Sequence, residues 1–143
     1  MKIAAFFMLL ATVSGGVFAD TASDQQHIEQ MMRHTWERPE APLDIGPVTV
    51  EGNHAVAGWT QGDRGGRALL RKSHDEWRVV LCAGDALLET TTLRNSGVAG
   101  NQADALSAAV AKAEQSIAPE RVKQFALFKG VMRVDKEQGH QAH

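Results

Sequence analysis

The side chains of this chain that could do chemistry are soft metal ligands. Cys82 is the single cysteine, and His27, Met31 and His34 follow one another at i, i+4 and i+7. On a helix, this spacing places the three side chains along one face. Copper(I) prefers thiolate and thioether sulfur, and it also accepts imidazole. The residue types therefore predict copper as a ligand, with Cys82 as the first candidate and the helix face of His27, Met31 and His34 as the second.

Packing is the role that we favour for these residues over metal ligation. Met31 also belongs to an apolar helical stripe with Ile28 and Met32, and methionine at such positions commonly fills space in a core. Cys82 directly follows the apolar run VVL, and free cysteine is among the most often buried residue types. A single cysteine cannot form an intramolecular disulfide, so burial, pairing with another molecule and metal ligation all remain open for Cys82.

The sequence offers no catalytic constellation. The glycines between residues 58 and 66 lie within and between predicted strands, whereas a phosphate-binding loop opens onto the N-terminus of a helix. The acidic residues of this region fall in predicted turns, and Asp85 stands where it could cap a following helix. We therefore expect that the protein is not an enzyme.

Residues 1–19 have the features of an export signal. Lys2 precedes an apolar run over residues 3–13, and Ala19 offers a small residue for cleavage. The run is shorter than the roughly 20 apolar residues that a membrane-spanning helix needs. We therefore predict cleavage after Ala19 and a periplasmic protein without membrane insertion. Residues 20–134 suit a single domain, and residues 135–143 a disordered polar tail.

The charge balance argues against nucleic acid as a partner. Fifteen basic and seventeen acidic residues give a net charge of −2 at pH 7. The longest basic run is the pair of Arg71 and Lys72, whereas the binding of a phosphate backbone needs a basic surface.

An α+β fold is predicted from the order of the hydrophobic patterns. Residues 23–36 carry a helical apolar stripe, which starts with the capping-box spacing of Ser23 and Gln26. Alternating patterns then predict a four-stranded antiparallel meander, with strands over residues 48–51, 54–61, 67–73 and 77–83. Further helices are predicted over residues 86–94, from residue 101 and from residue 119. This order is loosely similar to that of cystatin-like and NTF2-like folds.

The faces of the predicted sheet depend on the pairing register. A loop over residues 62–66 would place Gln61 opposite Arg67, and the next turn would align Ala68 with Cys82. Because side chains alternate along each strand, this register gives an apolar main face that the helix over residues 23–36 would cover. Cys82 would lie on the second face, near Gly58, which would let another backbone approach closely.

A small-molecule binding module is the alternative function, because the main face could line an apolar pocket. Its candidate residues are Trp59, Leu69, Arg71, Trp77 and Leu81. Arg71 could clamp an anion in a bidentate contact, or its stem could pack while its charged head reaches water. An open concavity over this face would favour ligand binding, and complete cover by helices would oppose it.

Two stretches of the predicted sheet are similar to a known family. They are AGWTQGDRGGRALLRK, residues 57–72, and VVLCAGDAL, residues 79–87. The similarity extends from TWERPEAPL, residues 35–43, to the helices of GVAGNQADALSAAVAKAEQSIAPERVKQFALF, residues 97–128. In these stretches the chain resembles the bacterial copper uptake system-associated proteins, which are small exported proteins linked to copper-acquisition loci.

The resemblance implies a non-enzymatic, periplasmic accessory role in copper uptake. It implies components of a copper uptake system as partners, but no reaction and no defined metal site. Copper is the one cofactor that we expect if the protein binds a cofactor at all. The chain has no closely spaced series of methionines and histidines of the kind that we associate with dedicated periplasmic copper chaperones. Partner binding and direct copper binding therefore both remain open as modes of action.

Overall fold

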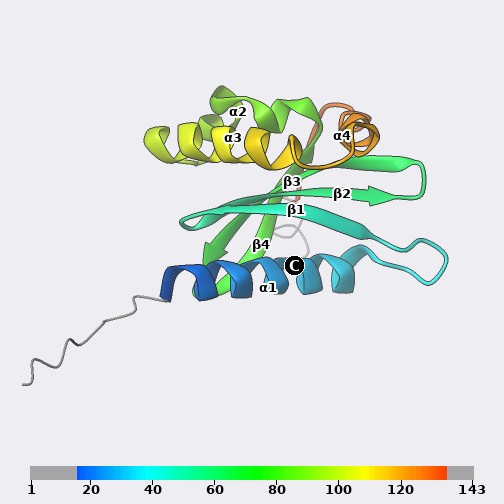
Figure 1. Ribbon diagram of the computed structural model, residues 1–143, viewed down its shortest axis with the longest axis horizontal. Coiled ribbons are helices and arrows are strands. Elements are labelled where there is room, and N and C mark those ends of the chain that lie inside the picture. The colour runs from blue at the N-terminus through cyan, green and yellow to red at the C-terminus, as the bar shows by residue number, and fades with distance from the viewer. Residues whose placement is uncertain (1–15, 135–143) are drawn as a thin grey trace, which may run out of the picture.

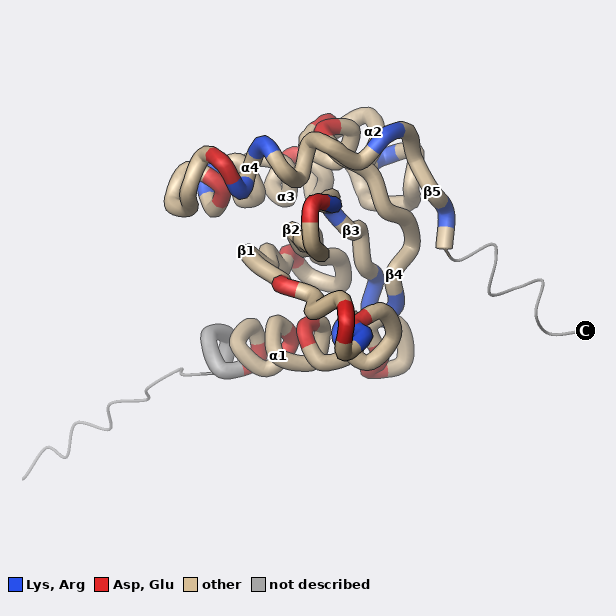
Figure 2. The backbone as a smooth tube through the Cα atoms, turned by 90° about the vertical axis from the view of Figure 1, so that its right-hand side faces the viewer, with Lys and Arg blue, Asp and Glu red and all other residues tan. Residues whose placement is uncertain are grey.

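A five-stranded antiparallel sheet between two layers of helices makes up the computed structural model, which describes residues 16–134 (Figure 1, Figure 2). Helix α1, Gly16–Trp36, covers one face of the sheet, which we call the α1 side. The opposite face, the α3 side, is covered by α2, α3 and α4, which span Thr90–Asn95, Gly100–Glu114 and Pro119–Phe125. The predicted α+β class is confirmed.

The strands follow chain order across the sheet, and each pairs antiparallel with the next. They are β1 Asp44–Glu51, β2 His54–Gln61, β3 Arg64–Ser73, β4 Glu76–Ala83 and β5 Val131–Arg133. A short 3-10 helix, η1 Asp85–Leu88, follows β4. The prediction of four strands is wrong, because β5 pairs with the outer edge of β4. A strand of three residues is too short to show an alternating pattern in the sequence.

Helix α1 ends at Trp36 as predicted, but it begins before Ser23. Ser23 therefore lies inside the helix, and the prediction that it caps the N-terminus is wrong. Ile28 and Met32, which are one turn apart, are buried against the sheet. None of the helices within residues 16–134 combines the length and the apolar character of a membrane span. Most of the predicted signal peptide and the predicted tail over residues 135–143 lie outside the described residues.

The β2–β3 hairpin corrects the predicted register. Gln61 pairs with Arg64 rather than with Arg67, because the chain turns through residues 62 and 63 instead of a five-residue loop. A shift by three residues moves every side chain of β3 to the other face. Leu69 therefore packs on the α3 side, and Arg71 is exposed rather than part of the α1 side. Arg67 becomes the buried arginine of this strand.

A bulge in β4 corrects the predicted faces of Leu81 and Cys82. The pairing of β3 with β4 shifts by one residue, which leaves Val80 as an extra residue in β4. Leu81 consequently packs on the α3 side and Cys82 on the α1 side, the reverse of the prediction. The predicted alignment of Ala68 with Cys82 is confirmed.

Helix α4 packs closely on the sheet at Gly58. The ring of Phe125 is fully buried there, and a Cβ atom at position 58 would overlap it. The prediction that Gly58 leaves room for another element is confirmed, but a side chain of α4 fills this room and not the expected backbone. Burial of a phenylalanine side chain contributes about 1.5–3 kcal/mol to folding, so this contact holds α4 firmly on the α3 side.

Candidate functional site

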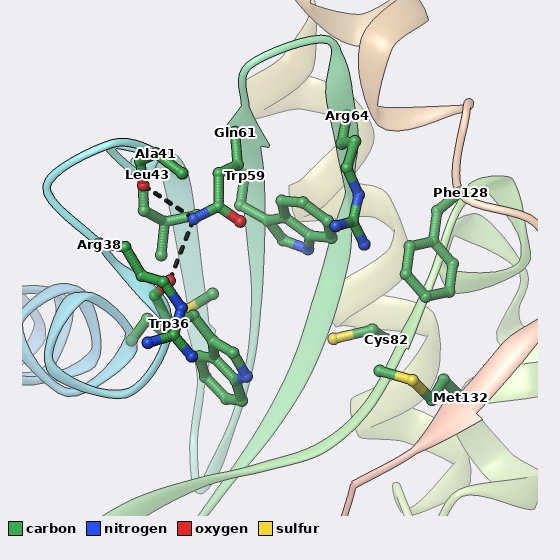
Figure 3. A pocket seen from close by; sticks show the side chains of 11 residues that line it. Trp36, Arg38, Ala41, Leu43, Trp59, Gln61, Arg64, Cys82, Phe128 and Met132 are labelled. Atoms are coloured by element: carbon green, nitrogen blue, oxygen red, sulfur yellow. Dashed lines mark hydrogen bonds between the residues drawn. The ribbon is translucent and has the colours of Figure 1, made fainter.

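A cavity of about 390 Å³ lies on the α1 side, where α1 ends (Figure 3). Its walls come from the last turns of α1, the loop before β1, strands β2 to β5 and the segment after α4. The lining residues are Met32, Trp36, Arg38, Ala41, Leu43, Trp59, Gln61, Arg64, Cys82, Phe128 and Met132. Helix α1 thus leaves a ligand-sized space uncovered at its end, and we call this space the α1 pocket.

The Gln61 side chain fixes the loop that forms one wall of the α1 pocket. Its amide nitrogen donates to the carbonyl oxygens of Trp36 and Ala41, at 3.0 and 2.9 Å (Figure 3). Within the loop, Arg38 and Ala41 exchange two backbone hydrogen bonds, at 3.2 and 3.0 Å. The end of α1 is thereby tied to the end of β2, which keeps this wall of the pocket in place.

Two sulfur-bearing side chains, Cys82 and Met132, lie together in the lining of the α1 pocket. Cys82 of β4 pairs with Met132 of β5 in the sheet register, and both side chains project toward the pocket (Figure 3). The Cβ atoms of directly paired residues on neighbouring strands lie roughly 4.5–5.5 Å apart. Met32 of α1 adds a third sulfur atom to the lining. Soft ligands from three separate elements therefore share one cavity.

The Cys82 thiol is protonated in the pocket at neutral pH. Burial raises its pKa to about 11, because the apolar surroundings disfavour the thiolate. Cys82 is only 8% exposed, whereas Met132 is 46% exposed and forms the rim. A thiol of this kind is a poor nucleophile, but a soft metal ion that binds it displaces its proton.

Trp59 brings an unpaired donor to the same cavity. Its ring meets that of Phe128 edge to face, with 6.0 Å between the ring centroids and 80° between the planes. The indole nitrogen of Trp59 is buried and has no hydrogen-bond partner, although a buried tryptophan N–H usually finds an acceptor. Trp77, also on the α1 side, donates its indole N–H to the Asp24 carboxylate at 3.0 Å.

The helix-face ligands predicted from the sequence do not line the α1 pocket. His27 and His34 are exposed on α1, and Met31 is half-buried against the core of the α1 side. Within residues 16–134, no group of three or more His, Cys, Asp or Glu side chains could hold a metal ion. Metal binding by His27, Met31 and His34 therefore stays a prediction, and the structure brings Cys82 to methionines instead.

Of the five residues predicted to form a ligand pocket, only Trp59 lines the cavity. Trp77 lies on the same side of the sheet but outside the cavity. Leu69 and Leu81 pack in the core of the α3 side. Arg71 is exposed, so the predicted anion clamp at this residue lies away from the cavity.

Two important lining residues, Phe128 and Met132, were not predicted. Both follow α4, in a stretch whose apolar residues fit neither a helical nor an alternating pattern. The available signal was Gly130, whose positive φ of 72° suits a turn that returns the chain to β4.

A second group of polar side chains is buried on the α3 side. The Nε and Nη2 atoms of Arg67 donate to the two carboxylate oxygens of Glu114, at 2.8 and 2.6 Å. Nη1 donates to Asp85 at 3.1 Å, and the guanidinium lies 5.5 Å from the centroid of the Phe125 ring. Burial alone would lower the pKa of Arg67, but the paired carboxylates raise it. Asp85 therefore binds Arg67, and the prediction that Asp85 caps a helix is wrong.

Comparisons with known proteins do not assign the chain to a family. No protein-family model, no curated protein and no solved structure matches the chain.

Proposed function

We propose that this protein is a non-enzymatic, periplasmic accessory protein of copper uptake that binds copper(I) in the α1 pocket. The observation that supports this most is the pairing of Cys82 with Met132 in the lining of the cavity. Copper(I) prefers thiolate and thioether ligands, whereas harder cations prefer oxygen. Export, cleavage after Ala19 and partners among copper uptake components belong to the same proposal, supported by the sequence features and the family resemblance.

Each residue has a distinct role in the proposed site. Cys82 loses its proton when the metal binds and supplies the thiolate. Met132 supplies a thioether from the rim, where its exposure gives an incoming ion or a partner protein access. Met32 offers a third sulfur from α1. The apolar walls at Leu43 and Phe128 keep water from the metal, which disfavours cations that need oxygen ligands.

Titration of the exported, purified protein with copper(I) against a competing chelator tests this proposal. We expect one tightly held equivalent of copper(I) in the parent protein. Cys82→Ser removes the thiolate and is expected to lower the affinity at least about a hundredfold, as the loss of a metal ligand should exceed the 10- to 100-fold effect of a supporting residue. Met132→Leu keeps the volume, removes the thioether and should weaken binding by a smaller factor.

Met31→Leu is the matched control, because Met31 lies on α1 but outside the cavity. Its affinity should equal that of the parent. Negligible copper(I) binding by the parent would rule out direct copper binding and leave partner binding as the mode of action. Tight binding that survives Cys82→Ser but is lost in His27→Ala would place the metal on the helix face of α1 instead.

Binding of a small molecule is the second candidate function, and the size of the cavity favours it. Ligand pockets in proteins usually enclose about 300–1,000 Å³, and the α1 pocket measures about 390 Å³. A single metal ion would leave most of this space unfilled. A ligand here would contact Trp59, as the sequence predicted, but it would not contact Arg71.

We also propose a loose kinship with cystatin-like or NTF2-like folds. The single long helix α1 on one face of an antiparallel sheet supports this comparison. The layer of α2, α3 and α4 on the opposite face would then be an addition. Such a kinship would describe the architecture and would not fix a function.

A further inference from the structure

The indole N–H of Trp59 is a donor for which the protein provides no acceptor. Trp59 is 8% exposed, and its nitrogen has no hydrogen-bond partner. A buried donor without a partner keeps the full cost of its desolvation. The indole of Trp77, which is 6% exposed, avoids this cost by donating to Asp24. The nitrogen has less than 1 Å² of accessible surface, so an acceptor reaches it only when the ring or its neighbours shift slightly. An acceptor carried by a ligand in the α1 pocket would then satisfy Trp59 in the same way.

Positive charge borders the α1 pocket without a neutralising partner. Arg38 and Arg64 contribute to the lining, and none of the described lining residues is Asp or Glu. Among the residues that the structure describes, neither guanidinium has a hydrogen-bond or ion-pair partner. Arg64 pairs with Gln61 in the sheet, so it is the diagonal cross-strand neighbour of Trp59 on the same face, and both line the cavity. An anionic group at this point would meet both a guanidinium and the unpaired N–H.

The rest of the cavity is suited to an apolar body. Trp36, Leu43 and Phe128 present aromatic and aliphatic surface, and the methionines add thioether surface. A small polar ion such as inorganic phosphate would leave this surface in contact with water. An apolar molecule without charge would leave the N–H of Trp59 unpaired. Only a ligand that has both an anionic group and an apolar body fits the whole lining.

We propose that the α1 pocket binds a small organic anion, a monocarboxylate with an apolar aliphatic or aromatic body. Its carboxylate accepts the N–H of Trp59 and faces Arg64, and its body lies against Leu43 and Phe128. This inference rests on the second candidate function, small-molecule binding. It does not require copper, because the carboxylate is placed at Trp59 and Arg64 rather than at Cys82.

Calorimetric titration of the purified protein with octanoate and with phenylacetate tests the proposal. We expect saturable binding of at least one of them, and at least about tenfold weaker binding of the matching alcohol, 1-octanol or 2-phenylethanol, because a hydrogen bond to a charged acceptor is stronger than one to a neutral group. Trp59→Phe keeps an aromatic ring, removes the donor and should weaken binding of the acid about tenfold or more. Arg64→Gln should weaken it about threefold, since this arginine is exposed.

Arg71→Gln is the control for Arg64→Gln, because Arg71 is an exposed arginine outside the cavity. It should leave the affinity unchanged. The proposal is overturned if neither acid binds saturably, if the alcohol binds as tightly as its acid, or if Trp59→Phe binds as the parent does. Urea unfolding curves check that each variant is folded. If Trp59→Phe does not fold, the proposal is tested by the affinity of the alcohol relative to its acid and by the affinity of Arg64→Gln for the acid.

Cys82→Ser separates this proposal from copper binding. We expect this variant to keep the carboxylate affinity within about twofold, because Cys82 is not placed against the carboxylate, while its copper(I) binding is lost. A parent protein that binds the acids but no copper(I) would refute the metal site and uphold the anion site. The reverse result would uphold the metal site and refute the anion site.

Discussion

Two buried side chains on opposite sides of the sheet, Arg67 and Trp59, differ in whether the protein supplies acceptors for their N–H groups. On the α3 side, the guanidinium of Arg67 is fully buried, but Glu114 and Asp85 accept its N–H groups. On the α1 side, the N–H of Trp59 is buried beside a cavity and has no acceptor. The protein therefore supplies acceptors for the N–H groups of Arg67 but none for the N–H of Trp59. The contrast holds for these two groups and not for the whole sides, because Nε2 of the buried His54, whose Nδ1 contacts Gln102 of α3, also has no partner. We therefore assign a structural role to Arg67 and a binding role to Trp59, which lines a cavity.

The largest expected effect comes from breaking the buried ion pair on the α3 side. Glu114→Leu removes the buried carboxylate that pairs with Arg67 and leaves this fully buried guanidinium with Asp85 alone, whose side chain is 70% exposed. Breaking a buried pair in this way costs about 3–5 kcal/mol of unfolding free energy. Denaturant unfolding at pH 7 measures this loss, and copper(I) binding by the folded fraction should be unchanged.

An exposed ion pair of the same layer provides the control. Arg94 and Asp104 lie 2.8 Å apart with about half of each side chain exposed, at 47% and 60%. Arg94→Ala should therefore cost less than about 1 kcal/mol. If Glu114→Leu cost no more than Arg94→Ala, the buried pair would not stabilise the α3 side as we infer.

The two buried tryptophans of the α1 side provide the next comparison. Trp77→Phe removes a hydrogen bond to the Asp24 carboxylate, which should cost about 1–3 kcal/mol at pH 7. Trp59→Phe removes a donor that has no acceptor, so its cost should be the smaller of the two. Equal losses of unfolding free energy in the two variants would show that the N–H of Trp59 contributes as much to stability as the hydrogen-bonded N–H of Trp77, which contradicts our account of an unpaired donor.

The cost of Trp77→Phe should depend on pH. Burial works to raise the pKa of Asp24, but hydrogen bonds from Lys72 and Trp77 outweigh it and hold that pKa below its usual value. A lowered carboxyl pKa contributes stability above the unfolded value of about 3.9, and this contribution is lost as the pH falls through the folded pKa. The difference between Trp77→Phe and the parent should therefore shrink below about pH 4 in thermal unfolding.

Copper(I) affinity should rise with pH because of Cys82. Its pKa of about 11 means that the free thiol is protonated between pH 6 and pH 8, and the metal must displace one proton. The apparent affinity should therefore increase about tenfold per pH unit in this range. Chelator competition at several pH values measures the slope. Met132→Leu should bind more weakly with the same slope, and a pH-independent affinity in the parent would show that Cys82 is not the ligand.

The sequence was sufficient for the α+β class and for the element boundaries near β2. The bounds of β2, residues 54–61, match the prediction, and Gly58 receives another element as expected. The β2–β3 register was not predictable, because GDRGG fits a turn at its first two residues as well as a five-residue loop. Since the two registers differ by an odd number, the choice decided which face each residue of β3 occupies.

The candidate site was harder to predict than the fold. Cys82 was identified by its chemistry, but the bulge at Val80 placed it on the other face. Its partner Met132 lies in a three-residue strand that pairs with β4 from far along the chain. Local patterns carry no information about such a pairing, because the contact depends on how the whole C-terminal layer packs.

Methionine methyl NMR of the exported protein, with and without one equivalent of copper(I), tests the central claim most directly. Residues 20–143 contain three methionines, Met31, Met32 and Met132, and only the last two line the α1 pocket. We predict that the methyl signal of Met132 shifts most, that of Met32 less, and that of Met31 not at all. A shift of Met31 alone would place the metal on the helix face with His27 and His34, and no shift in any of the three would contradict copper(I) binding in the α1 pocket.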